Sequence, residues 1–529
     1  MYSEREMSPE IDYELEELQI RLDAGQVDAL AKWQSTFEEA HKRWQNNRAR
    51  RLLQILKTSP TDDTILRTVR YFDATLLVYL GEWAKAKDAF EQSISLCRKL
   101  GDRKGELRAV NGYANLLRRS ADHLDSALEA FDAILQSDFP DETSKVILRN
   151  GKGLLLYEKG DLGQAQAYFE EVASLARKTG DQELLASVLH NLGSIAWTRG
   201  RLQDATELLQ EALDLQRAFR DSHGEAETLN SLGLVEEGLG QWEQAIETYQ
   251  LSLEKMEQLG DYYGQAQVLV NLGNAYSLRR EMVLARSCIE QAYEIAKDVG
   301  NPRLQGQSLT ALGDAYRING EMEKAMDFLH QGMDIKIKSG EFRSLKHNWL
   351  SLGAVFHQLK QPQDAQSAYE KALEIAQGQN DRRMTVFILV NQSALSTAQE
   401  NFQEAKASLI EAKALALEEE YHDCLAWIYE QEGDLDLLSQ EPNTSHVLEA
   451  YSLALWHACQ FNEYELEGLI QRLSRFWIAH AEDGEGQVSL WFCDSIIQLW
   501  QNSDELEKCP TVIEEFTRLR KIIKETIGK

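Results

Sequence analysis

Glycine recurs at a fixed step of 40 residues through most of this chain. The row begins at Gly153 and continues at Gly193, Gly233, Gly273, Gly313, Gly353 and Gly433, with Ser393 as its one departure from glycine. Alanines run in phase with it twelve residues later, from Ala165 to Ala405. A constant period of this length indicates that one supersecondary unit has been copied and stacked, each copy burying its apolar face against its neighbours.

The copy from 186 to 222 shows what the unit contains. Apolar residues between Val188 and Ala196 follow the i, i+3, i+4, i+7 spacing of an amphipathic helix, and a second such stripe runs from Leu202 to Phe219. Gly200 separates the two stripes, and a residue without Cβ can take the left-handed conformation that ends a helix. Each unit is therefore predicted to be a helix, a tight turn and a helix, with Gly193 and Ala205 at their close contact.

These positions resemble the motif of the tetratricopeptide repeat (TPR), which has the same glycine slot, the same two alanine slots and the same helix order. The resemblance covers roughly residues 65 to 440. It departs in length, because the usual repeat has about 34 residues and ends in proline, whereas these copies run to 40 and end in pairs such as Gly180-Asp181. In this respect the chain is similar to kinesin light chains, to Rap-type bacterial peptide receptors and to the sensor regions of bacterial STAND NTPases.

The resemblance implies an all-α fold, a right-handed superhelical solenoid closed by helical caps at both ends. We expect an N-terminal helical cap over residues 1–64, about nine repeats over 65–445 and a C-terminal helical capping region over 446–529. Four helix-length amphipathic segments fill that last region, and Trp456, Trp477, Trp491 and Trp500 are expected to help cover the last repeat.

Charge and composition exclude several classes of function. The chain carries 56 basic and 86 acidic residues, a net charge of −30, which disfavours a nucleic-acid partner because phosphate binding requires a basic surface. No run of 18 apolar residues predicts a membrane span, and the first residues do not form an apolar leader. Six scattered cysteines without a CxxC pair are expected to be reduced, so a cytoplasmic location is predicted.

One basic cluster interrupts this acidic chain, at 41–44 and 48–51. We interpret it as a helix face that pairs with neighbouring acids. A docking site for an acidic partner is the alternative.

A search for catalytic chemistry finds none. The segment from Arg149 to Gly153 contains glycines and a lysine, but it falls within a predicted helix, where no loop can surround a phosphate. The signatures HExxH, GxSxG and those of kinases are absent. We therefore predict that the protein is not an enzyme and needs no cofactor and no metal. An unrecognised site near His457 or Asp494 is the remaining enzymatic alternative.

The resemblance places the first helix of each unit on the concave face, with the residues around the glycine slot pointing inward. In TPR proteins that bind extended peptides, an asparagine two residues before that slot can hydrogen-bond the ligand backbone, and Asn191, Asn271 and Asn391 occupy it. An amide suits this task because it carries a donor and an acceptor without a charge to desolvate. The alternative is that these amides bond only within their own helices. The candidate binding residues are Asn191, Ser194, Asn230, Asn271, Asn274, Asp314, Arg317, His357 and Asn391.

These observations favour a scaffold or sensor that binds a peptide segment or partner protein in its concave groove. A free C-terminus is disfavoured as ligand, because the inner positions lack a lysine clamp. The alternative is a regulatory TPR subunit that controls a separately encoded bacterial effector enzyme, such as a protease, nuclease or STAND NTPase, in signalling or defence. The segment 451–462 supports it weakly, since it is similar to the end of some TPR regions attached to STAND NTPases.

Overall fold

The computed structural model is helical throughout the residues it describes. These are 13–23, 29–42, 51–56, 63–79, 83–102, scattered positions between 105 and 135, 142–419, 421–438, 444–461, 463–501 and 510–527. Residues 43–50 of the basic cluster lie outside this set. The N-terminal helices are α1 (Tyr13–Asp23), α2 (Ala29–Lys42), α4 (Asp63–Tyr79) and α5 (Trp83–Leu100).

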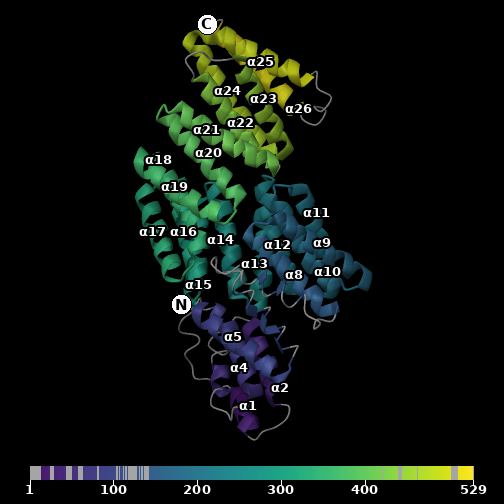
Figure 1. Cartoon of the computed structure of the whole chain (residues 1–529). Helices are drawn as coiled ribbons and strands as arrows, with labels where there is room; N and C mark the ends of the chain where they lie inside the picture. The colour runs from purple at the N-terminus through teal and green to yellow at the C-terminus, as the bar shows by residue number, and fades with distance from the viewer. Residues whose placement is uncertain are drawn as a thin grey trace.

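The regular part of the chain consists of helix pairs, each pair forming one unit of 40 residues (Figure 1). The first helices of the units are α8 (Glu142–Lys159), α10 (Gln182–Thr198), α12 (Ser222–Gly238), α14 (Tyr262–Leu278), α16 (Pro302–Ile318), α18 (Leu345–Gln358), α20 (Arg382–Ala398) and α22 (His422–Leu437). The second helices are α9 (Leu162–Thr179), α11 (Leu202–Phe219), α13 (Trp242–Leu259), α15 (Met282–Asp298), α17 (Met322–Lys338), α19 (Pro362–Gly378), α21 (Phe402–Glu418) and α23 (Thr444–Phe461). The predicted all-α solenoid is confirmed.

The glycine slot is where the two helices of a unit meet most closely. A Cβ placed on Gly193 would lie 2.7 Å from Cγ of Leu209 and 3.5 Å from the carbonyl oxygen of Ala205. The predicted contact between Gly193 and Ala205 is thus confirmed, and it includes a large side chain on the second helix. The same geometry recurs along the row, with Tyr369 facing Gly353.

The two consecutive residues that close each unit, such as Gly180 and Asp181, have separate roles. Gly180 adopts φ +73°, which ends α9, and the Asp181 carboxylate accepts a hydrogen bond of 3.0 Å from the backbone N–H of Leu184, which begins α10. Such a cap stabilises a helix by about 1 kcal/mol. Glu341 provides no side-chain cap, and the next helix begins instead with the 3-10 turn η2 (Phe342–Ser344).

Curvature places the first helices on the inside of the solenoid. Successive first helices contact one another, as α14 does α16 and α20 does α22. In the described part of the chain, successive second helices have no comparable contact. The first helices therefore form the inner surface, which is the arrangement that the resemblance implied.

The C-terminal helices continue the core of the last units. They are α24 (Glu463–His480), the π-helical turn η3 (Ala481–Glu485), α25 (Gly486–Gln501) and α26 (Pro510–Ile527). The Trp477 and Phe492 rings stack with centroids 4.3 Å apart, in one apolar cluster with Tyr429 of α22. Trp491 lies on the surface with 41% of its area exposed.

Two further expectations concern the cell compartment. No helix among the described residues has both the length and the apolar character required to cross a membrane. Cys97, Cys288, Cys424 and Cys493 are free thiols. Cys459 takes part in a disulfide, so the expectation that all six cysteines are reduced is wrong at this position. Cytoplasmic location stays a prediction.

Candidate functional site

Asparagines from neighbouring units meet on the inner surface. The Nδ2 of Asn271 on α14 donates to Oδ1 of Asn230 on α12 at 2.9 Å, and the Nδ2 of Asn191 on α10 donates to Oδ1 of Asn150 on α8 at 3.4 Å. All four side chains are partly exposed. Since an amide offers two donor hydrogens and an acceptor with two lone pairs, each pair keeps hydrogen-bonding capacity for a ligand.

The other predicted residues divide into local and unengaged groups. Asn391 donates to the carbonyl of Phe387 on its own helix at 2.7 Å, which is the bond that the alternative interpretation predicts. Ser194 likewise donates to the carbonyl of His190 at 3.1 Å. Arg317 lies 3.4 Å from the Asp314 carboxylate one turn away. The side chains of Asn274 and His357 make no hydrogen bond within the part of the chain that the structure describes.

Burial shifts the pKa values of three titratable groups on the first helices toward the neutral form. Burial raises the pKa of Glu237 on α12 to about 7, although a hydrogen bond from the Tyr249 hydroxyl at 3.2 Å opposes this shift. Burial raises the pKa of Asp314 as well, against the opposing effects of Arg317 and Ser351, and it lowers the pKa of His190 to about 4. Each of these three shifts disfavours the charged form of its group.

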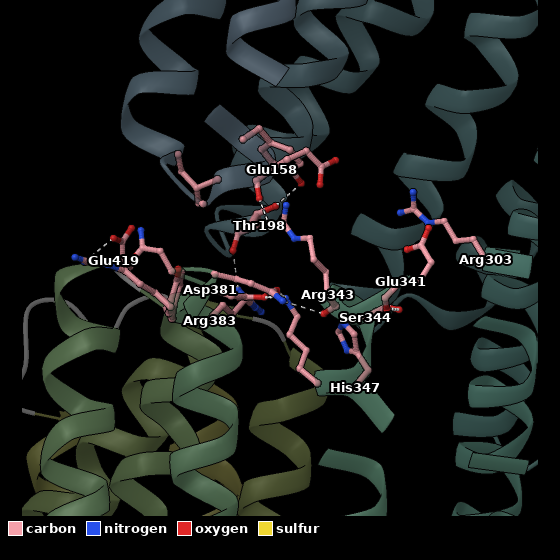
Figure 2. Close-up of a pocket in the computed structure, with 18 residues that line it drawn as sticks. Glu158, Thr198, Arg303, Glu341, Arg343, Ser344, His347, Asp381, Arg383 and Glu419 are labelled. Carbon is pink, nitrogen blue, oxygen red and sulfur yellow. Dashed lines mark hydrogen bonds and ion pairs between the residues drawn. The ribbon is translucent and has the colours of Figure 1, made fainter. Parts of the chain in front are cut away.

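A second polar region lies where distant units of the solenoid meet. The Arg343 guanidinium donates to the carbonyl oxygen of Glu158 at the end of α8, and the Arg383 guanidinium donates to that of Thr198 at the end of α10, at 3.3 Å (Figure 2). In both bonds the partners are 185 residues apart. The chain thus bends until its α18 and α20 units touch its α8 and α10 units, an arrangement we call the inter-turn contact.

The inter-turn contact encloses a cavity of about 310 Å³, which we call the edge pocket. Lysines and arginines line it together with carboxylates, and Figure 2 shows their side chains converging from both sides. The charged lining residues are Arg303, Arg343, Lys346, Arg382, Arg383, Glu158, Glu341, Asp381 and Glu419. None of these was among the predicted site residues, although Arg303, Arg343 and Arg383 recur at the 40-residue step.

Removing the inter-turn contact should loosen the solenoid. Each bond joins a charged donor to a carbonyl, which is worth about 1.5 to 3 kcal/mol, and both carbonyls lie at helix C-termini, where cations are favoured. We expect Arg343→Ala with Arg383→Ala to increase the radius of gyration measured by small-angle X-ray scattering, with helix content unchanged. The control is Arg177→Ala with Arg217→Ala, whose ion pairs join neighbouring helix pairs only. Equal radii for the two double variants would contradict this expectation.

Sequence comparison identifies the repeat. The family model described as tetratricopeptide repeat matches residues 146–218, 224–298 and 264–338, the same units that the structure shows as helix pairs. The chain contains tetratricopeptide repeats. A second model, described as anaphase-promoting complex subunit 5, matches 58–120, 315–399 and 384–432. No curated protein matches this chain significantly in sequence.

Several solved structures are similar to this chain. A Rap protein complexed with competence and sporulation factor is 12% identical, covers 77% of this chain and 99% of its own, and has a TM-score of 0.49. The apo quorum sensor NprR from B. thuringiensis is 15% identical, covers 64% of this chain and 97% of its own, and has a TM-score of 0.43. BtubC (BKLC) from P. vanneervenii is 21% identical, covers 42% of this chain and 91% of its own, and has a TM-score of 0.34. At TM-scores this low, the likenesses add nothing to the repeat assignment, which rests on the sequence model and the helix pairs. As a TPR solenoid, the protein is an interaction scaffold.

Proposed function

We propose that the inner surface of the TPR solenoid binds an extended peptide segment of a partner protein. The observation that carries this proposal is the pairing of Asn230 with Asn271 across adjacent first helices of the inner surface. A peptide unit has one donor and one acceptor, so it can bond the free hydrogens and lone pairs of such an amide pair without bringing a charge into the groove.

The polar groups of an uncharged peptide backbone match those of the asparagine pairs. Each paired amide uses one donor or acceptor on its neighbour and keeps the others for water or a ligand, since all four side chains are partly exposed. An extended peptide along the first helices would present its N–H and C=O groups at regular intervals to successive units. Control of a separately encoded bacterial effector enzyme, the alternative function, would use the same surface, and the sequence of the bound segment would distinguish the two.

Amide removal should weaken binding without unfolding the protein. A peptide selected from a random display library on the full chain serves as probe, and its affinity is measured by fluorescence polarisation. We expect Asn191→Ala with Asn271→Ala to reduce the affinity at least tenfold, since two lost hydrogen bonds are worth about 1 to 3 kcal/mol together. Asn391→Ala should have a smaller effect, because the Asn391 amide already bonds its own helix.

The matched control is Asn319→Ala, which removes an exposed amide bonded locally to Glu321. Circular dichroism of every variant shows whether the helices persist. If the double variant binds the selected peptide as tightly as the Asn319→Ala control does, the inner asparagines are not the binding site and the proposal fails.

A further inference from the structure

Three arginines occupy one structural position in successive units. Arg303, Arg343 and Arg383 each precede the glycine slot of their unit by ten residues. Arg303 and Arg383 lie in the first turns of α16 and α20, and Arg343 lies in η2, directly before α18. All three line the edge pocket, where Arg343 and Arg383 bond the ends of α8 and α10 and Arg303 lies beside Glu341 (Figure 2). The next unit has Asp423 at this position, so the row of arginines ends there.

Most charges of the edge pocket are matched by a partner. Lys346 lies 2.6 Å from the Asp381 carboxylate, and Arg383 lies 2.6 Å from that of Asp423. Arg382 bonds Glu419 at 2.9 Å. Lys346, Arg382 and Arg383 are thus already bonded to carboxylates of the protein, and these ion pairs hold the walls of the pocket in place. A ligand carboxylate would bind donors other than these three.

Two arginines differ from the others. Arg303 makes no hydrogen bond and no ion pair within 4 Å in the described part of the chain. Arg343 has no carboxylate at that distance either, and its Nη1 is buried without an acceptor, although Nη2 bonds the carbonyl of Glu158. A buried guanidinium hydrogen without a partner loses its hydration and gains nothing in exchange. Arg303 and Arg343 are therefore the two arginines of the pocket that bond no carboxylate directly. Burial opposes the charge of Arg303, but Tyr263, Glu341 and Glu158 act on it at longer range and raise its pKa.

We propose that the edge pocket binds the carboxylate side chains of an acidic peptide segment, with Arg303 and the free Nη1 of Arg343 as donors. A guanidinium presents its N–H groups as a planar fork that matches the two oxygens of a carboxylate. Aspartate and glutamate carry a single negative charge, which one guanidinium such as that of Arg303 can match.

Other anions fit the pocket less well. A phosphate group carries nearly two negative charges, which the carboxylates of Glu158, Glu341, Asp381 and Glu419 would oppose. A nucleic acid would bring many phosphates toward a chain of net charge −30. The same net charge repels an acidic peptide at long range, but the repulsion is screened beyond about 8 Å at physiological salt, so local contacts with the arginines prevail.

The site is distinct from the asparagine pairs. It lies at the N-terminal ends of α16, α18 and α20, whereas Asn230 and Asn271 lie in the middle of α12 and α14. One partner could engage both surfaces, but neither proposal depends on the other. Loss of binding through Arg303 with binding through the asparagines intact, or the reverse, therefore separates them.

The experiment uses the full chain and calorimetric titration with acetylated, amidated hexaglutamate. The same peptide made of glutamine is the control probe, and inorganic phosphate is the competitor. We expect hexaglutamate to bind and hexaglutamine not to bind, with Arg303→Gln weakening the affinity at least tenfold and Arg303→Lys weakening it less, because lysine keeps the charge but loses the fork. Arg286→Gln, which removes an exposed arginine paired with Glu290, should leave the affinity unchanged.

Three results would overturn the proposal. The first is equal binding of the two peptides, and the second is an unchanged hexaglutamate affinity in Arg303→Gln. The third is displacement of hexaglutamate by phosphate at equal concentration, which would show a site for small anions instead. Because Arg303 makes no bond that holds the fold together, its variants should stay folded, and their unfolding midpoints verify this.

Discussion

Gly353→Ala is expected to destabilise the solenoid by about 3 kcal/mol, the upper part of the usual range for an overpacked core. A Cβ at Gly353 would lie 2.3 Å from Cε1 and 2.4 Å from Cδ1 of Tyr369. The Tyr369 ring is fully buried on α19 and has no space to retreat into. The helix pair must therefore separate, which weakens contacts with the units on both sides because each unit is stabilised by its neighbours. Urea unfolding followed by circular dichroism measures the change.

Gly378→Ala is the matched control for this prediction. Gly378 ends α19 in an exposed position, and a Cβ there would meet nothing within 4 Å. Because alanine is the better helix former, this variant should be as stable as the wild type or more stable, by up to about 1 kcal/mol. A second variant tests the mechanism, since Tyr369→Ala should cost less stability in the Gly353→Ala background than in the wild type. Equal midpoints for Gly353→Ala and Gly378→Ala would show that close packing at the slot is unimportant.

The sequence predicts the repeating unit well because its features are local. Gly200 ends a helix through its own backbone conformation, at φ +70°, and the predicted second helix from Leu202 to Phe219 has the same bounds in the structure. Asp181 caps a helix three residues away. Features of this kind depend on neighbours within one or two turns, so a single copy of the motif contains the information needed to predict them.

The inter-turn contact could not be predicted in the same way. It joins Arg343 to Glu158 across 185 residues of sequence. Whether these two residues meet in space depends on the small rotations between successive units, added up along the solenoid. The sequence of a single repeat does not define this total rotation. The equal spacing of Arg303, Arg343 and Arg383 was visible in the sequence, but without the bend there was no reason to prefer those arginines to the other charged residues of the helices.

The candidate binding residues could be predicted from the sequence only in part, which places them between these two cases. The asparagine slot selected Asn271 and Asn191, whose amides meet those of Asn230 and Asn150, and it also selected Asn391, whose amide bonds its own helix. Binding through any of them stays a prediction. The slot defines which way a side chain points. Whether the amide finds a partner depends on the residue one unit away, such as Asn150 for Asn191, and the search around each slot did not include that pairing.

The pH dependence of stability should reveal a buried lysine on α17. Lys336 is 4% exposed, and its ammonium donates to Oδ1 of Asn348 at 2.7 Å and to Oγ1 of Thr310 at 2.9 Å. Burial lowers the pKa of Lys336 from 10.5 to about 8, with Arg303 acting in the same direction and the carboxylates of Glu341 and Asp314 opposing it. The folded protein therefore releases this proton more readily than the unfolded chain does.

The sign of the effect follows from proton linkage. Between pH 8 and pH 10.5 the unfolded chain holds the proton and the folded protein does not, so stability rises with pH in that window. Below pH 8 the full penalty of the buried charge is present. A shift of this size corresponds to roughly 3 kcal/mol at 1.36 kcal/mol per pH unit. Replacing the lysine with an apolar side chain of similar length should remove the penalty.

Lys336→Met should accordingly be more stable than the wild type at pH 7 by up to about 3 kcal/mol. The hydroxyl of Thr310 keeps a partner in the variant, because it also donates to the carbonyl of Gly306 at 2.7 Å, and Asn348 still donates to that of Leu329 at 3.1 Å. The advantage should shrink as pH rises from 8 to 10.5, since the wild-type lysine then becomes neutral in both states. Urea unfolding at a series of pH values measures the difference, with the exposed Lys338→Met as control. Parallel stability curves for Lys336→Met and the wild type would mean that the buried amine keeps its ordinary pKa.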